Sequence, residues 1–213
     1  MSRLDKIGII GIGSYLPATY MTAKDISLAT GIPEDVIDLK FGVSRKPIPG
    51  PGDTTSYMGL QAAKNALEMA KVSPLDLDLV IWNGAQHKDY PCWLASLKVA
   101  YDLGAQNAWG FDMEAMCGSM MAGMETAKSL MRNNDDLRTV LLVSGYRNSD
   151  LISLKEPDTS FMFDIGAGGA AMVLKKGADR NILLESAFKG DGSFSEGCVV
   201  PVGGTKKWPP VAE

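Results

Sequence analysis

Residues 111–125 read FDMEAMCGSMMAGME, and the rest of the chain can be interpreted outward from this stretch. Its first residues end an apolar run typical of a strand, and the later ones have helical spacing. Cys117 lies at the junction between the two. A cysteine at a helix start is close to unpaired backbone N–H groups and to the positive end of the helix dipole, and both favour a thiolate. The stretch therefore predicts a reactive cysteine between a strand and a helix.

The helix that carries Cys117 is expected to be buried. Apolar side chains recur at helical spacing from about Met116 to Met131, and small residues keep one face thin. Close neighbours could pack on that face. Asp112 and Glu114 would oppose a thiolate if their carboxylates pointed toward the sulfur. At this point Cys117 could equally be a small buried core residue, as most intracellular cysteines are.

Composition describes an ordinary folded domain. The 213 residues are 46% hydrophobic and 22% charged, with a formal net charge of −4, so no basic surface for nucleic acid is indicated. Cys92, Cys117 and Cys198 form no CxxC pair, which argues against a zinc site or a disulfide framework. A reducing cytoplasm fits this usage best. The apolar run near the N-terminus is too short and too rich in glycine for a signal or membrane segment.

The first third of the chain predicts one strand and three helices. Residues 7–12 read as a buried strand, and Thr22 with Asp25 forms a capping box for a helix to residue 29. Pro33 opens a short helix that Gly42 can close, residues 47–52 form a loop, and a long helix runs from about 54 to 71. The pair of glycines in 11–13 is not a dinucleotide fingerprint, because residue 16 is leucine and no helix opens there.

The remainder predicts a mixed, mostly parallel sheet flanked by helices. Strands at 79–83, 107–113 and 140–144 alternate with helices at 93–103 and after Cys117, a βαβ pattern that indicates parallel strands. Residues 161–164, 170–174 and 182–188 then read as consecutive strands joined by tight turns. The last stretch, 201–213, has no periodicity and reads as a tail.

Several segments, in this order, resemble the N-terminal half of a ketoacyl-ACP synthase III, a condensing enzyme with the thiolase fold. The segments are 9–17 (IIGIGSYLP), 77–81 (LDLVI), 103–105 (LGA), 111–117 and 166–168 (GAG). The resemblance predicts a thiolase-like domain over residues 1–204, followed by a tail or the start of a linker over 205–213. Members of this family are longer, because the fold consists of two similar halves.

The resemblance implies a Claisen condensation in fatty acid or related acyl biosynthesis. An active-site cysteine takes an acyl group from a thioester, and a carbanion from malonyl-ACP then attacks it. Cys117 matches this nucleophile. Coenzyme A or acyl carrier protein is then part of the substrate, no separate cofactor or metal is implied, and a cytoplasmic homodimer paired through strand 107–113 is expected. The family's histidine and asparagine belong to the second half, so this chain alone is expected to lack condensing activity.

Three further residues are implied in substrate binding. Val36 and Lys40 stand where the family often has a Trp and an Arg that hold coenzyme A, so only Lys40 can offer a charge to phosphate. Tyr90 matches an aromatic residue that reaches across the dimer interface. His87 lies in the loop where the related hydroxymethylglutaryl-CoA synthases place an acid, and it is equally compatible with a solvated surface group.

Two alternatives stay open. The chain could be similar to a hydroxymethylglutaryl-CoA synthase, or it could be a non-catalytic thiolase-like module that binds acyl thioesters or a partner protein. Met116 beside the cysteine and Glu114 before it depart from the small residues usual in the family, which argues against a standard acetyl-binding pocket.

Overall fold

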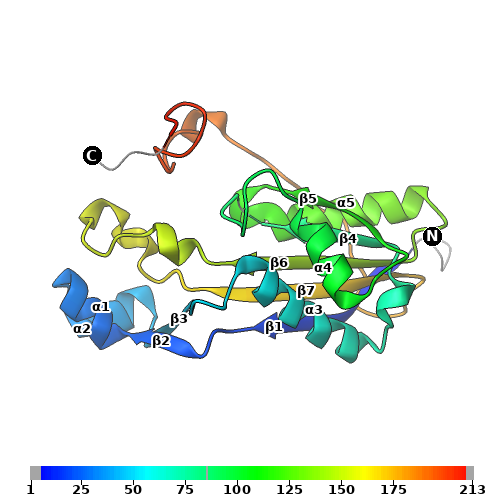
Figure 1. The fold of residues 1–213 in the computed structure, drawn as a ribbon, viewed down its shortest axis with the longest axis horizontal. Helices are drawn as coiled ribbons and strands as arrows, with labels where there is room; N and C mark the ends of the chain where they lie inside the picture. Colours follow the sequence, from blue (N-terminus) through cyan, green and yellow to red (C-terminus); the bar gives the residue numbers. More distant parts are fainter. Residues whose placement is uncertain (1–5, 85, 210–213) are drawn as a thin grey trace.

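The computed structural model describes residues 6–84 and 86–209, and its central feature is a five-stranded mixed sheet (Figure 1). The order across the sheet is β1 (Ile7–Tyr15), β7 (Gly168–Lys176), β6 (Thr139–Tyr146), β4 (Leu79–Asn83) and β5 (Trp109–Met113). β7 is antiparallel to both β1 and β6, whereas β4 is parallel to both β6 and β5. The mixed α/β sheet expected from the sequence is confirmed, with half of its pairings parallel.

Helices cover both faces of this sheet. α3 (Thr55–Ala70) and α4 (Ala95–Leu103) pack on one face, where Val80 and Trp82 of β4 point. α5 (Ser119–Asn133) packs on the other face, against Leu79 and Ile81 of the same strand. The alternation of these four buried side chains is the period of a strand that is covered on both sides.

Glycines of the sheet let α3 lie unusually close to it. A Cβ atom on Gly13 of β1 would overlap the backbone carbonyl oxygen of Ala62, and one on Gly145 of β6 would overlap that of Thr55. The backbones of strand and helix can approach this closely only without a side chain between them. The N-terminus of α3 is thereby fixed beside the C-terminal end of β6.

A small second unit lies beyond one end of the sheet (Figure 1). It consists of the antiparallel strand pair β2 (Thr19–Thr22) and β3 (Arg45–Ile48), the helices α1 (Ala23–Thr30) and α2 (Glu34–Val36) that connect them, and a π-helical turn over Ile37–Phe41. The capping box of Thr22 and Asp25 is present, and Gly42 ends the π-helical turn with a φ of 68°. The expected loop at 47–52 is wrong at its start, because Pro47 and Ile48 belong to β3. Pro47 has no backbone N–H to donate, but β2 and β3 form a two-stranded sheet in which each strand has a free edge, so proline is tolerated there.

Two predicted strands are absent. Residues 161–164 end a 3₁₀ helix over Pro157–Met162, and 182–188 contribute only an isolated bridge between Ile182 and Gly8. The apolar residues there have the local pattern of a strand, but Phe161 and Leu184 are exposed. β7 already has β1 and β6 on its two edges, so no further strand can pair with it. Further 3₁₀ turns cover Pro74–Asp76, Met116–Gly118, Asn148–Leu151 and Gly192–Phe194.

The C-terminal segment contains no strand after β7 in the described residues up to 209. The described part of the predicted tail, 205–209, has turns and bends only, and residues 210–213 lie outside the described residues. The first five residues of the predicted domain lie outside them as well. None of the helices in the described part of the chain has the length and apolar character needed to cross a bilayer.

Candidate active site

Cys117 lies on a short turn between β5 and α5. The strand ends at Met113, a 3₁₀ turn spans Met116–Gly118, and the α-helix begins at Ser119. Met116, just before the cysteine, has a φ of 48°, a left-handed conformation that is uncommon for a residue with a long side chain. The sequence thus placed the cysteine correctly between a strand and a helix.

The expectation that the cysteine helix is buried is wrong for its first turn. Cys117 is exposed, and Met116 and Met121 are 62% and 54% exposed, respectively. Only one face of α5 is covered, through residues such as Ala127 and Met131 that contact the sheet. The small residues do allow close packing, because a Cβ atom on Gly123 would overlap the Oδ1 atom of Asn83 at the end of β4.

A groove begins beside the cysteine turn. It has a volume of about 520 Å³ and lies between α5 and the extended segment 183–189. Its apolar lining includes Met121, Met124 and Phe188, while Lys128 is almost fully buried and donates a hydrogen bond to the Leu184 carbonyl over 2.8 Å. The groove starts at Gly118, directly after Cys117, and its lining is mixed, because it also includes the charged residues Glu125, Glu185 and Lys189.

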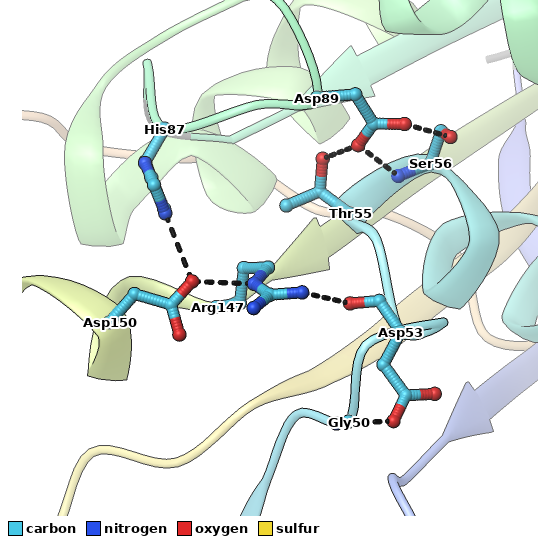
Figure 2. Close-up of polar contacts among 8 residues, drawn as sticks. All are labelled: Gly50, Asp53, Thr55, Ser56, His87, Asp89, Arg147 and Asp150. Carbon is cyan, nitrogen blue, oxygen red and sulfur yellow. Dashed lines mark hydrogen bonds and ion pairs between the residues drawn. The ribbon is translucent and has the colours of Figure 1, made fainter.

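The start of α3 is capped by its N-cap residue Thr54, whose Oγ1 accepts the Tyr57 N–H, and by Asp89 from the loop after β4. The Asp89 carboxylate accepts hydrogen bonds from the Thr55 Oγ1 (2.7 Å), the Ser56 backbone N–H (3.1 Å) and the Ser56 Oγ (2.5 Å), as Figure 2 shows. Burial acts to raise the pKa of Asp89, but the hydrogen bonds from Ser56 and Thr55 outweigh it and lower the pKa. Asp89 thus fastens the loop after β4 to the helix as a carboxylate.

Asp112 does the same at the start of α4. It accepts the backbone N–H groups of Ala95 and Ser96, each over 2.9 Å, and the Lys88 ammonium over 2.7 Å. The side chains of Lys88 and Asp112 are 12% and 7% exposed, so this ion pair is largely shielded from water. Asp112 therefore points toward α4 and Lys88, and it is the Lys88 charge that compensates it.

His87 belongs to a chain of polar contacts rather than to the cysteine turn. Its Nε2 lies 3.3 Å from the Asp150 Oδ2, which also accepts a hydrogen bond from the Arg147 Nε over 2.6 Å. Arg147 continues to the Asp53 backbone carbonyl over 2.9 Å, as Figure 2 shows. Burial acts to raise the pKa of Asp150, and the hydrogen bonds from Arg147 and His87 more than offset it and lower the pKa.

The chain of contacts ends at β1. The Asp53 carboxylate accepts hydrogen bonds from the Gly50 N–H (2.8 Å) and the Tyr15 hydroxyl (2.7 Å). The second bond, with the negative charge of Asp53, raises the pKa of Tyr15 to about 12. These contacts join the loop after β4, the turn after β6 and the first strand into one network.

The other two residues expected in substrate binding are exposed. Lys40 lies on the π-helical turn of the small second unit, and no hydrogen bond or ion pair links it to the cysteine turn in the described residues. Tyr90 is 65% exposed and its ring packs edge-on against Trp93, with the ring centroids 5.7 Å apart. Their expected roles stay predictions.

Sequence reasoning missed two residues of this region. Ser119 makes contacts with the backbone on both sides of the turn, and its position two residues after the cysteine gave no signal beyond its small size. Burial raises the pKa of Tyr146 at the end of β6, and the nearby thiols of Cys117 and Cys198 raise it further. Only the position of Tyr146 at the end of a strand could have suggested it.

Comparisons with known proteins agree on one family. The family model described as 3-oxoacyl-[acyl-carrier-protein (ACP)] synthase III matches residues 111–192, which include Cys117 and β6. The beta-ketoacyl-[acyl-carrier-protein] synthase III of Streptomyces lividans is 32% identical over 164 residues, which are 77% of this chain and 48% of the relative.

Two solved structures are also similar to this chain in fold and sequence. The 3-oxoacyl-(acyl carrier protein) synthase III of Pseudomonas aeruginosa PAO1 has a TM-score of 0.79 at 25% identity, over 88% of this chain and 56% of that structure. The priming beta-ketosynthase from the R1128 polyketide biosynthetic pathway has a TM-score of 0.74 at 30% identity, over 80% and 50%. The chain spans between 48% and 60% of the curated relatives that it matches.

Proposed function

Because this chain is related to the N-terminal portion of ketoacyl-ACP synthase III proteins, we propose that it carries the acyl-accepting half of such an acyltransferase. Cys117 is the residue that receives the acyl group. The observation that carries the proposal is the exposed Cys117 at a helix start without a side-chain cap, inside the matched family region. The donor is an acyl thioester of coenzyme A or of acyl carrier protein.

The proposed step is a transfer from one sulfur to another. The Cys117 sulfur attacks the thioester carbonyl carbon, the carbonyl becomes a tetrahedral oxyanion, and the bond to the carrier sulfur then breaks. The carrier leaves as a thiol with the proton that Cys117 gave up. The Cys117 backbone N–H and the positive end of the α5 dipole would stabilise the oxyanion, because the N–H groups of Gly118 and Ser119 already bond to the Ala115 and Met116 carbonyls.

The acyl-enzyme would then react with a carbanion from malonyl-ACP. This condensing step is expected of the whole enzyme, and we propose it here from the family alone. Lys40 would contribute a positive charge for the phosphates of coenzyme A, and the loop with His87 and Tyr90 would border the acyl group. The groove between α5 and 183–189 begins at Gly118, beside Cys117, and its side chains Met121, Met124 and Phe188 are suited to contact an acyl chain.

The test of the acyl transfer uses the three exposed cysteines as internal controls. The purified protein is incubated with acetyl-CoA at neutral pH, digested and analysed by mass spectrometry for acetyl groups on cysteine peptides. Acetylation should appear on the Cys117 peptide and disappear in Cys117→Ala, while Cys92→Ala and Cys198→Ala leave it unchanged. Equal acetylation of all three cysteines, or none, would refute the proposal.

A homodimer paired through β5 is also proposed. β5 is an edge strand, and Trp109 on it is 50% exposed although its ring packs near Phe111, with the centroids 5.6 Å apart. An exposed edge strand with a large aromatic residue is suited to pairing with a second copy. Light scattering at micromolar concentration should give the mass of a dimer, and Trp109→Lys should give a monomer. A monomer in the parent protein would contradict the pairing.

A further inference from the structure

Ser119 links the cysteine turn to the loop that follows β4. It is the first residue of α5 and is 3% exposed. Its Oγ accepts a hydrogen bond from the Ala115 backbone N–H over 2.8 Å, and it lies 2.7 Å from the Met116 carbonyl and 3.1 Å from the Gly84 carbonyl. One hydroxyl thus touches the residues before the cysteine and the loop that follows β4.

The hydroxyl can satisfy these contacts only in a fixed arrangement. A serine has one proton to donate, so the Met116 carbonyl receives it at the shorter distance while the Gly84 carbonyl is an alternative acceptor. The N–H of Ala115 uses one lone pair of the oxygen. The Ser119 Oγ therefore holds both Ala115 and Met116, the two residues that precede Cys117.

The backbone that the hydroxyl holds is strained. Met116 has a φ of 48°, which costs a residue with a Cβ atom on the order of 1–3 kcal/mol. Such a conformation persists only where the surroundings fix it. The Ser119 hydroxyl contacts the backbone of the residue before Met116 and the carbonyl of Met116 itself, so it holds this turn from within. Without it, Met116 can relax and the direction of the Cys117 side chain changes.

We infer that Ser119 is a positioning residue for Cys117, which orients the thiol for attack on an acyl thioester. This inference rests on the proposed role of Cys117 as the acyl acceptor. Acyl transfer needs the sulfur aligned with the carbonyl carbon and with the oxyanion donors, and misplacement by about 1 Å can cost about a hundredfold in rate. Alkylation by iodoacetamide needs only an accessible thiol. The two reactions therefore separate orientation from exposure.

The experiment compares both reactions in a protein with Cys92→Ser and Cys198→Ser, so that Cys117 is the single thiol. Ser119→Ala should slow acetylation by acetyl-CoA about tenfold or more, with iodoacetamide labelling changed by less than about twofold. Ser96→Ala is the matched control: Ser96 is a fully buried helical serine, and its Oγ has no hydrogen-bond partner among the described residues. It should leave both rates unchanged.

A second substitution tests the strain directly. Glycine accepts a φ of 48° without cost, so Met116→Gly added to Ser119→Ala should recover most of the lost acetylation. This double variant also keeps the test decisive if Ser119→Ala alone does not fold. Unchanged acetylation in Ser119→Ala, an equal loss in both reactions, or no recovery in the double variant would overturn the inference. If the parent itself is not acetylated at Cys117, the proposed function fails first, and the inference falls with it.

Discussion

The starts of α3 and α4 differ from the start of α5 in one respect that bears on chemistry. Asp89 and Asp112 each reach over from another segment, and they accept one backbone N–H at the start of α3 and two at the start of α4, respectively. At the start of α5 the N–H groups of Gly118 and Ser119 bond instead to the backbone carbonyls of Ala115 and Met116, and the exposed Cys117 lies there in place of a capping carboxylate. An aspartate at a helix start compensates the positive end of the dipole permanently, whereas an open start, without such a carboxylate, leaves it for a charge that develops during a reaction.

The largest expected effect concerns the start of α4. Asp112→Ala would remove the acceptor of two backbone N–H groups and leave the shielded Lys88 ammonium without its carboxylate. Removing one partner of a buried ion pair is strongly destabilising, so the free energy of unfolding should fall by about 3 kcal/mol. Urea unfolding measures this change.

The matched control for that variant is Asp102→Ala. Asp102 also pairs with a lysine, Lys98, but on the exposed surface of α4, where the two side chains are 25% and 44% exposed. This change should stay within about 0.5 kcal/mol. Similar losses in both variants would mean that the Asp112 cap contributes no more than a surface ion pair, and the contrast between capped and open starts would lose its basis.

A smaller effect with a pH signature is expected at the start of α3. Asp89 has a lowered pKa in the folded protein, so its carboxylate stabilises the fold above the ordinary aspartate pKa of about 3.9, and that contribution is lost as pH falls through the lowered value. Asp89→Asn should lower the free energy of unfolding by about 1–2 kcal/mol at pH 7. The difference from the parent should shrink below about pH 4, when measured by urea unfolding across pH. A difference that is constant over this range would contradict a charged cap.

The smallest effect is expected at His87. Its contact with Asp150 is partly exposed, and Asp150 keeps its hydrogen bond from Arg147 without it. His87→Ala should change the free energy of unfolding by no more than about 0.5 kcal/mol and leave acetylation of Cys117 unchanged. Arg147→Ala serves as the comparison, and it should cost about 1 kcal/mol because Arg147 also binds the Asp53 carbonyl. A large loss of acetylation in His87→Ala would assign His87 to the reaction and would contradict the interpretation that it only contacts Asp150.

Local signals in the sequence predicted most of the fold. The capping box at Thr22, the helical spacing after Cys117 and the buried run at 79–83 each depend on a few neighbouring residues, and all three appear in the structure. The strand predicted at 182–188 could not be judged locally, because its bridge, from Ile182 to Gly8, is to the edge strand β1 at the far end of the sequence. Apolar residues that stay exposed, such as Leu184, have the same local pattern as a strand.

The site was predictable only in part. The position of Cys117 at a strand-to-helix junction indicated a reactive cysteine. Its match to the family nucleophile then predicted its role as the acyl acceptor. The partners of Asp89 and Asp112 could not be foreseen, because each carboxylate meets a helix start that lies 16 or more residues away in the sequence. Ser119 is a similar case, since its contact with Gly84 spans 35 residues.

The pairing of β1 has a consequence for how the chain acquires its structure. Ile7 is opposite Lys176 in the sheet, and Gly8 also meets Ile182, so the first strand has no partner until nearly the whole described chain has been synthesised. Until then β1 can pack against α3, but its backbone hydrogen-bonding groups have no partner strand. Contacts between residues so far apart in the sequence slow folding, and they prolong the exposure of apolar surface and of an unpaired strand edge. This protein should therefore depend on chaperones during synthesis more than a chain whose first strand forms a hairpin.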